Sequence, residues 1–137
     1  MALEDYRPPT KVKLAALWAS TMFCYVYGDY FGLYIPGTLA DMNRGEIGPL
    51  GHATPGILVG VSLMMAIPSL MVALSLLLPA RLCRWTCVIL GIAYTGIMAV
   101  TLPGSEPFYK TLGVIEIALT LAITIIAFRW PRETGHG

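Results

Sequence analysis

Two acidic residues, Asp29 and Glu116, lie inside hydrophobic stretches of a chain that otherwise keeps nearly all of its charge in short connecting segments. A carboxyl group inside hydrocarbon is costly, so such residues usually face the interior of a helical bundle and serve a function. A carboxylate there can hold a cation, a proton, or a ligand that carries an amine or a hydroxyl group. No basic residue falls at the same depth, so a cationic ligand would supply the missing charge.

The composition predicts that these acids belong to a membrane protein. Of the 137 residues, 56% are hydrophobic and only 12% are charged, whereas about a quarter of the residues in an ordinary soluble domain are charged. Four windows are long and apolar enough to span a bilayer as helices: roughly residues 14–35, 55–78, 82–102 and 107–128. We therefore expect an all-α fold, with residues 1–137 forming a single membrane domain, a four-helix transmembrane bundle of up-down-up-down topology. Residues 36–54 would form an extracytoplasmic loop.

The basic residues are distributed unevenly between the two sides of this arrangement. Seven of them fall on one side: Arg7, Lys11, Lys13, Arg81, Arg84, Arg129 and Arg132. Only Arg44 and Lys110 fall on the other side, so the positive-inside rule predicts that both termini are cytoplasmic. A net charge of +1, with no basic stripe between aromatic residues, argues against a nucleic-acid partner.

Several short patterns predict where helices begin and how they pack. Thr54-Pro55 and Glu106-Pro107 each put a capping residue before a proline, so the second and fourth helices are expected to begin at these prolines. The loop between the first two helices is rich in Gly, Asp, Asn and Pro and is expected to have little regular structure. Two GxxxG pairs predict close helix contacts: Gly28 with Gly32, and Gly56 with Gly60. The tryptophans are expected at the membrane interfaces: Trp18, Trp85 and Trp130.

A proline and both acids are predicted to share one layer of the membrane. Counted from the nearest cytoplasmic basic residues at about 1.5 Å per residue, Glu116 and Pro68 lie roughly 20 Å deep and Asp29 roughly 24 Å deep. Proline has no amide hydrogen, so the carbonyl of Met64 loses its usual helical partner. In a membrane this carbonyl must be satisfied by protein or water.

Helical spacing predicts that Glu116 points into the bundle. It shares a face with small and polar residues: Tyr109, Gly113, Thr120 and Thr124. The opposite face is apolar and is expected to meet lipid: Leu112, Ile115, Leu119 and Ile126. The candidate ligand-binding residues are accordingly Asp29, Glu116, Tyr25, Tyr94, Thr120 and Pro68.

A purely structural role for the acids is the alternative. Protonated or hydrogen-bonded carboxyls could simply fix helix packing through four neighbours: Tyr25, Tyr94, Thr95 or Ser69. Other chemistry has little support, because Cys83 and Cys87 lack CxxC spacing and the two histidines, His52 and His136, lie outside the spans. There is no nucleophile motif or phosphate loop, so we expect no catalytic residue, no metal and no cofactor.

The order of several motifs resembles that of a bacterial family of small four-helix membrane proteins of unknown function, loosely similar to the DoxX-like proteins. The motifs that carry this resemblance are Leu17-Trp18, Tyr27-Gly28-Asp29, Pro68-Ser69-Leu70-Met71, Arg84-Trp85, Ile115-Glu116-Ile117 and Ala127-Phe128-Arg129-Trp130. The resemblance implies a compact four-helix bundle in the bacterial cytoplasmic (inner) membrane and a role for Asp29 and Glu116. It implies no activity. The chain departs from the pattern at Cys83 and Cys87, where polar amides are usual.

Three classes of function remain open. The first is a non-enzymatic membrane protein that binds or moves a small cationic or protonatable ligand, with the two acids as anchors. The second is an accessory or assembly subunit of a membrane redox complex, by analogy with DoxX-like proteins. The third is a membrane enzyme that acts on a lipophilic substrate with the acids as a proton donor and acceptor. The lipid bilayer is the expected partner, together with a homo-oligomer or a larger membrane complex.

Overall fold

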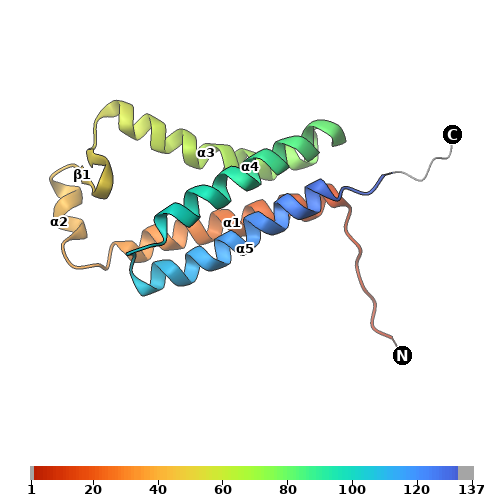
Figure 1. Ribbon diagram of the computed structural model, residues 1–137, viewed down its shortest axis with the longest axis horizontal. Helices are drawn as coiled ribbons and strands as arrows, with labels where there is room; N and C mark the ends of the chain where they lie inside the picture. Colours follow the sequence, from red (N-terminus) through yellow and green to blue (C-terminus); the bar gives the residue numbers. More distant parts are fainter. Residues whose placement is uncertain (1, 133–137) are drawn as a thin grey trace.

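The computed structural model describes residues 2–132, so His136 lies outside the described part of the chain. The fold is mostly helical, with four long helices: α1 (Thr10–Gly32), α3 (Pro55–Leu77), α4 (Ala80–Thr101) and α5 (Pro107–Phe128) (Figure 1). The segment between α1 and α3 contains a short helix and a two-stranded hairpin with a 3-10 turn between its strands: α2 (Thr38–Asn43), β1 (Glu46–Ile47), η1 (Gly48–Leu50) and β2 (Gly51–His52).

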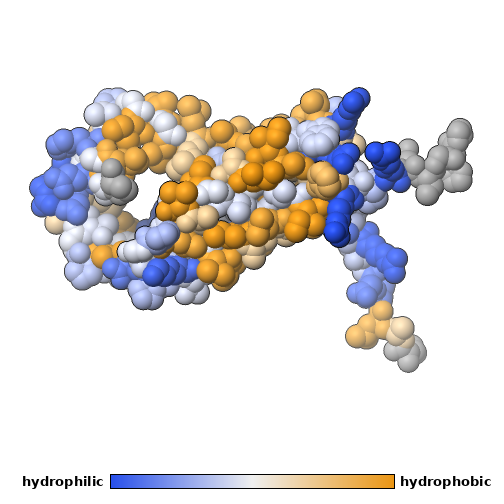
Figure 2. Space-filling view, in the orientation of Figure 1, coloured by the Kyte–Doolittle hydropathy of each residue, from blue (hydrophilic) through white to orange (hydrophobic). Residues whose placement is uncertain are grey.

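Within residues 2–132, three helices are long and apolar enough to cross a membrane, namely α3, α4 and α5. Helix α1 is as long as α3, but it is less apolar because it carries Lys11, Lys13 and Asp29. Side chains such as Leu63, at 59% exposure, cover the outside of the helices, and apolar residues dominate that surface in Figure 2. A surface of this kind is costly in water and suits a hydrocarbon environment.

Successive long helices run in opposite directions, and both ends of the chain leave from the same end of the molecule (Figure 1). Helix α5 packs against α1 and α4, and α1 also packs against α3. Helices α3 and α4 meet near the turn that joins them and then diverge (Figure 1). The fully buried residues of α3 begin only at Pro68, and its first three turns are largely exposed.

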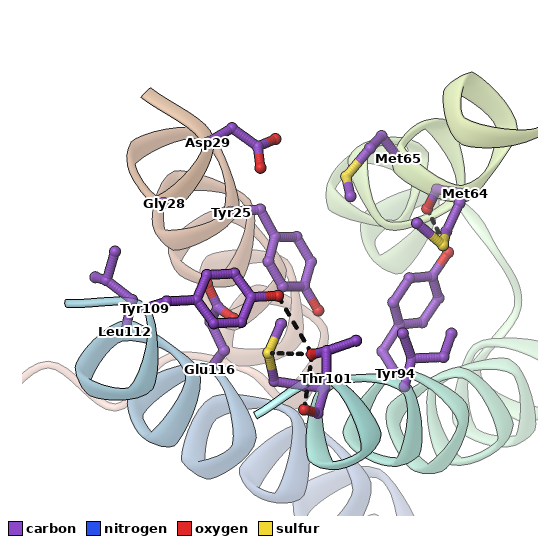
Figure 3. A pocket seen from close by; sticks show the side chains of 12 residues that line it. Tyr25, Gly28, Asp29, Met64, Met65, Tyr94, Thr101, Tyr109, Leu112 and Glu116 are labelled. Carbon is purple, nitrogen blue, oxygen red and sulfur yellow. Dashed lines mark hydrogen bonds between the residues drawn. The ribbon is translucent and has the colours of Figure 1, made fainter. Parts of the chain in front are cut away.

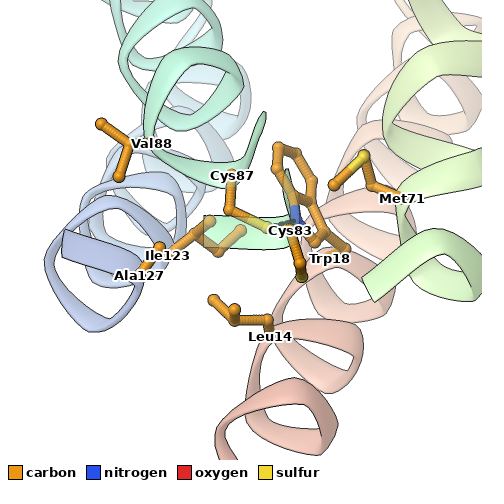
Figure 4. Packing of buried hydrophobic residues seen from close by; sticks show 8 residues of the cluster. All are labelled: Leu14, Trp18, Met71, Cys83, Cys87, Val88, Ile123 and Ala127. Atoms are coloured by element: carbon orange, nitrogen blue, oxygen red, sulfur yellow. Dashed lines mark hydrogen bonds between the residues drawn. The ribbon is translucent and has the colours of Figure 1, made fainter. Parts of the chain in front are cut away.

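The densest core lies at the end of the molecule where the chain termini leave. It contains eight buried residues from all four long helices: Leu14, Trp18, Met71, Cys83, Cys87, Val88, Ile123 and Ala127 (Figure 4). Trp18 is fully buried there and its indole Nε1 donates to Cys87 Sγ at 3.5 Å, so the prediction that it lies at a membrane interface is wrong. Two hydrogen bonds from side chains to backbone carbonyls also join the helices at this end, from Lys11 Nζ to Leu78 at 2.7 Å and from Arg84 to Phe128 at 2.9 Å.

The closest helix contact joins α4 and α5. A Cβ atom on Gly91 would lie 2.2 Å from Thr124 Oγ1 and 3.1 Å from the Thr120 carbonyl oxygen, so only glycine fits there. The Thr95 and Thr120 hydroxyls are 2.6 Å apart across the same seam. Small residues four apart on both helices allow this approach.

The predicted close contacts at the two GxxxG pairs are not formed. A Cβ atom on Gly32 or Gly60 would meet nothing within 4 Å, and one on Gly28 would make an ordinary contact at 3.6 Å. One on Gly56 would reach only the side chain of Thr54, its near neighbour in the chain. A GxxxG pair gives close packing only where another helix lies against its glycines. In this fold the close approach is that of α5 to Gly91 of α4.

Helices α3 and α5 begin at Pro55 and Pro107, the residues at which the sequence predicts them to begin. The Thr54 hydroxyl caps α3 by accepting from the amide of Ile57 at 3.2 Å. The expectation that the loop has little regular structure is wrong, because α2 and the β1–β2 hairpin occupy it. Glycines with positive φ, including Gly45 at 75° and Gly51 at 76°, allow the turns that fold it back.

Candidate functional site

Asp29 and Glu116 line the same cavity, which lies between the four long helices and has a volume of about 110 Å³. We call it the inner cavity. Twelve residues line it: Tyr25, Gly28, Asp29, Met64, Met65, Tyr94, Ile97, Met98, Thr101, Tyr109, Leu112 and Glu116 (Figure 3). Its volume is several times the roughly 10–15 Å³ that one water molecule requires. None of these lining residues is a lysine, arginine or histidine.

Glu116 is the most deeply buried charged residue of the site. It is 4% exposed, which confirms that it points into the bundle, and no hydrogen bond reaches its carboxyl group from any side chain or amide in residues 2–132. Its backbone carbonyl accepts from Thr120 Oγ1 at 3.0 Å in the ordinary helical manner. The predicted lipid-facing position of Leu112, four residues before it, is wrong because Leu112 lines the inner cavity.

Asp29 lies on α1 at the junction between the inner cavity and a larger one. The second cavity has a volume of about 1100 Å³, and we call it the outer cavity. Four residues line both cavities: Gly28, Asp29, Thr101 and Tyr109. Asp29 is exposed and lines both cavities, whereas Glu116 lines only the inner one. The two cavities therefore adjoin at Asp29.

Pro68 affects the site through the backbone rather than by lining it. Because Pro68 has no amide hydrogen, the Met64 carbonyl has no partner within α3. The Tyr94 hydroxyl on α4 donates to this carbonyl at 2.5 Å, which confirms that the protein supplies the missing partner. The bond joins α3 and α4 beside the inner cavity (Figure 3). Tyr94 thus lines the inner cavity and also fixes α3 to α4 through its hydrogen bond to Met64.

The hydrogen bonds that would give the acids a purely structural role are not formed among the described residues. Tyr94 donates to Met64, Ser69 donates to the Met65 carbonyl at 2.7 Å, and Thr95 donates to the Gly91 carbonyl at 2.7 Å. Tyr25 is 7% exposed, and no hydrogen bond joins its hydroxyl to either acid among the described residues. The carboxyl groups therefore face the cavity without a protein partner in residues 2–132.

Four of the six predicted site residues line the inner cavity: Tyr25, Asp29, Tyr94 and Glu116. The other two do not. Pro68 is buried one helical turn after Met64, and Thr120 lies in the α4–α5 seam one turn after Glu116, where its hydroxyl meets that of Thr95. That any of these residues binds a ligand stays a prediction.

Sequence reasoning missed most of the apolar wall and one side-chain pair. Tyr109 donates to Thr101 Oγ1 at 3.2 Å, and Thr101 in turn donates to the Met98 carbonyl at 2.9 Å. Tyr109 shares a helical face with Glu116, so the spacing could have predicted that Tyr109 lines the same cavity. The three methionines of the wall had no such signal: Met64, Met65 and Met98.

Acidic residues also line the outer cavity. They are Asp29, Asp41, Glu46 and Glu106, and no lysine, arginine or histidine is among its lining residues within the described chain. Arg44 lies close by and forms ion pairs with Asp41 and, at 3.6 Å, with Glu46. Glu106 and Asp29 have no such pair among the described residues. The lining of the outer cavity therefore carries an excess of acidic groups, which favours cations.

The described residues contain no group of three or more His, Cys, Asp or Glu side chains that could hold a metal ion. Comparison with curated proteins finds no match, and comparison with solved structures finds none either. A family model matches residues 1–136 of the chain. The match includes every described helix and the residues that line both cavities. The chain belongs to this family, a family of unknown function designated DUF6326.

Proposed function

We propose that this chain is an integral membrane protein that binds or moves a small cationic or protonatable ligand, with Asp29 and Glu116 as its anchors. One observation carries the proposal: both acids line a single cavity, and no basic residue lines it within the described chain. Two carboxyl groups in a low-dielectric space repel one another and attract a positive charge. A bound cation would relieve the cost of burying Glu116.

The outer cavity would provide the route to this site. It shares Asp29 with the inner cavity, and its remaining acids would raise the local concentration of cations. A ligand would meet Asp29 first and Glu116 second. This order suits either a binding protein that captures its ligand from one side or the first half of a transport cycle.

The test is equilibrium binding of radiolabelled methylammonium to the purified protein in detergent. Wild-type protein is expected to bind methylammonium, and Glu116→Gln is expected to lose this binding while remaining folded. Glu4→Gln, a change in the exposed N-terminal segment, is the matched control and is expected to bind like the wild type. Undiminished binding by folded Glu116→Gln would exclude the proposal.

We further propose that α1 also crosses the membrane, which gives a four-helix transmembrane bundle of up-down-up-down topology with both termini cytoplasmic. The uneven placement of basic residues supports this orientation, and the family resemblance supports a bacterial inner-membrane location. The looser likeness to DoxX-like proteins stays a prediction.

This topology predicts which side of the membrane each loop reaches. Asn43→Cys, at the exposed end of α2, is expected to react with a membrane-impermeant maleimide in intact cells. Arg81→Cys, in the first turn of α4, is expected to react only after the membrane is opened. Equal labelling of both positions in intact cells would contradict the topology. The native Cys83 and Cys87 are buried, whereas Cys24 is partly exposed, so both cysteine variants are made in a Cys24→Ser background.

A further inference from the structure

The inner cavity has an unusual chemical inventory for a polar site, because it is rich in aromatic rings and thioethers and poor in hydrogen-bond donors. Three tyrosines and three methionines contribute to its wall, beside the two acids. A ring face is electronegative, a thioether sulfur is polarisable, and a carboxylate is negative. All three kinds of group favour the binding of a cation that is only weakly hydrated in water.

The hydroxyl donors that line the inner cavity are almost all engaged elsewhere. Tyr94 donates to the Met64 carbonyl, Tyr109 donates to Thr101, and Thr101 donates to the Met98 carbonyl. Only the Tyr25 hydroxyl has no bond to a described residue. A ligand with several hydrogen-bonding groups would leave many of them unsatisfied here, which is costly. The site therefore suits a ligand that needs few hydrogen bonds.

Two of the rings are spaced so that one cation can contact both. The ring centroids of Tyr25 and Tyr94 are 6.5 Å apart, with an angle of 36° between the ring planes. A cation–π contact extends to about 6 Å from a centroid, so a single ammonium nitrogen can lie within reach of both rings. These are the rings of the two tyrosines that are least exposed in the site, at 7% and 5%.

A carboxyl group without a partner completes the arrangement. Glu116 is 4% exposed, lines this cavity, and accepts no hydrogen bond from the described residues. A bare metal ion is a poorer match, because calcium takes six to eight oxygen ligands and the described residues offer no cluster of three or more acidic, histidine or cysteine ligands. An organic cation needs only a counter-charge and apolar contact.

We infer that the inner cavity recognises a methylated ammonium group, held by the Tyr25 and Tyr94 rings and balanced by Glu116. This inference rests on the proposed function and narrows its ligand to tertiary and quaternary ammonium ions. The cavity volume of about 110 Å³ limits the bound group to a small head such as trimethylammonium. Longer substituents would extend past Asp29 into the outer cavity.

Tetramethylammonium is the probe for this inference, with methylammonium and tert-butanol as comparisons, in calorimetric titrations of the purified wild-type protein. Tetramethylammonium is expected to bind about tenfold more tightly than methylammonium. Its added methyl groups contact the rings, and the ion is less strongly hydrated, so its transfer from water into the cavity costs less free energy. Tert-butanol, similar in shape but neutral, is expected not to compete.

Variants of Tyr25 separate the ring from its hydroxyl. Tyr25→Phe keeps the ring and is expected to keep tetramethylammonium affinity within about threefold, whereas Tyr25→Leu is expected to lose about tenfold. Tyr27→Leu removes a ring from the same helix that lines neither cavity, and it is expected to bind like the wild type.

The outcomes distinguish this inference from the proposed function. If methylammonium binds in a manner that depends on Glu116 but tetramethylammonium binds more weakly, the ligand class is overturned and the cation site stands. If folded wild-type protein binds neither ion, both are overturned. Equal loss of affinity in Tyr25→Phe and Tyr25→Leu would overturn the role of the ring.

Discussion

Replacing Glu116 by glutamine is expected to lower methylammonium affinity by about 100-fold, the largest effect of any single substitution at the site. The carboxylate is 4% exposed and faces a cavity that no basic residue among residues 2–132 lines, so its charge is poorly screened and acts directly on a bound cation. A charged hydrogen bond contributes about 1.5–3 kcal/mol, and a second contribution comes from the low-dielectric surroundings. Equilibrium binding of radiolabelled methylammonium measures the change.

Stability provides the control for this substitution. Because no described residue donates a hydrogen bond to the Glu116 carboxyl group, the amide of Glu116→Gln breaks no bond and the unfolding midpoint should not fall. Asp29→Asn is expected to lose only about tenfold in affinity, since Asp29 is exposed to the outer cavity and water screens its charge. A larger loss in Asp29→Asn than in Glu116→Gln would reverse the assigned order of the two acids.

Tyr94→Phe is expected to lower the free energy of unfolding by about 1–3 kcal/mol, although it removes a single oxygen atom. The Tyr94 hydroxyl is the donor for the Met64 carbonyl, which has lost its helical partner to Pro68. Removing this donor leaves a carbonyl without a partner in an apolar environment, and that penalty exceeds the value of an ordinary hydrogen bond. Denaturant titration in mixed micelles measures the change.

A double-mutant cycle with Pro68→Ala tests the cause. Alanine restores the amide hydrogen at position 68, so the Met64 carbonyl regains a donor within α3. In this background Tyr94→Phe is expected to cost less than about half of its wild-type effect. An equal cost in both backgrounds would show that the proline is not the reason for the bond. Tyr27→Phe, on an exposed ring without a hydrogen bond to a described residue, should change stability little.

The sequence was sufficient where a local pattern has one physical solution. A capping residue before proline fixes a helix start, as at Pro55 and Pro107. A 3.6-residue period places Glu116 inside, and a proline within a helix requires an outside donor for the Met64 carbonyl. Each of these follows from a single helix without knowledge of its neighbours.

Predictions that depend on which helices meet were less successful. GxxxG spacing at Gly28 and Gly56 predicted close packing, but the close approach is at Gly91, because α5 lies along that face of α4. Trp18 is in the core rather than at an interface, since residues of α3, α4 and α5 join it in one buried cluster. Leu112 lines a cavity because that side of α5 lies against α1 near Gly28, and spacing within α5 carries no information on its neighbours.

The candidate site shows the same division. The two acids, with Tyr25 and Tyr94, line the inner cavity. Thr120 lies in the α4–α5 seam instead, and Pro68 acts indirectly, through the Met64 carbonyl that it leaves without a helical donor. The methionine wall depends on the distance between α3 and α4, which is set by long-range packing. Sequence spacing predicted that the two acids lie at a similar level along their helices, whereas the tertiary structure determined which side chains meet there.

Protection of Glu116 from a hydrophobic carbodiimide tests the central claim most directly. Dicyclohexylcarbodiimide reacts with carboxylic acids in apolar surroundings, and mass spectrometry locates and quantifies the product on each residue. Glu116 is expected to be labelled in the folded wild-type protein, and saturating methylammonium is expected to reduce that labelling at least tenfold. Labelling of Glu116 that is unchanged by saturating methylammonium would contradict the claim that this carboxyl group lies in a cation-binding cavity.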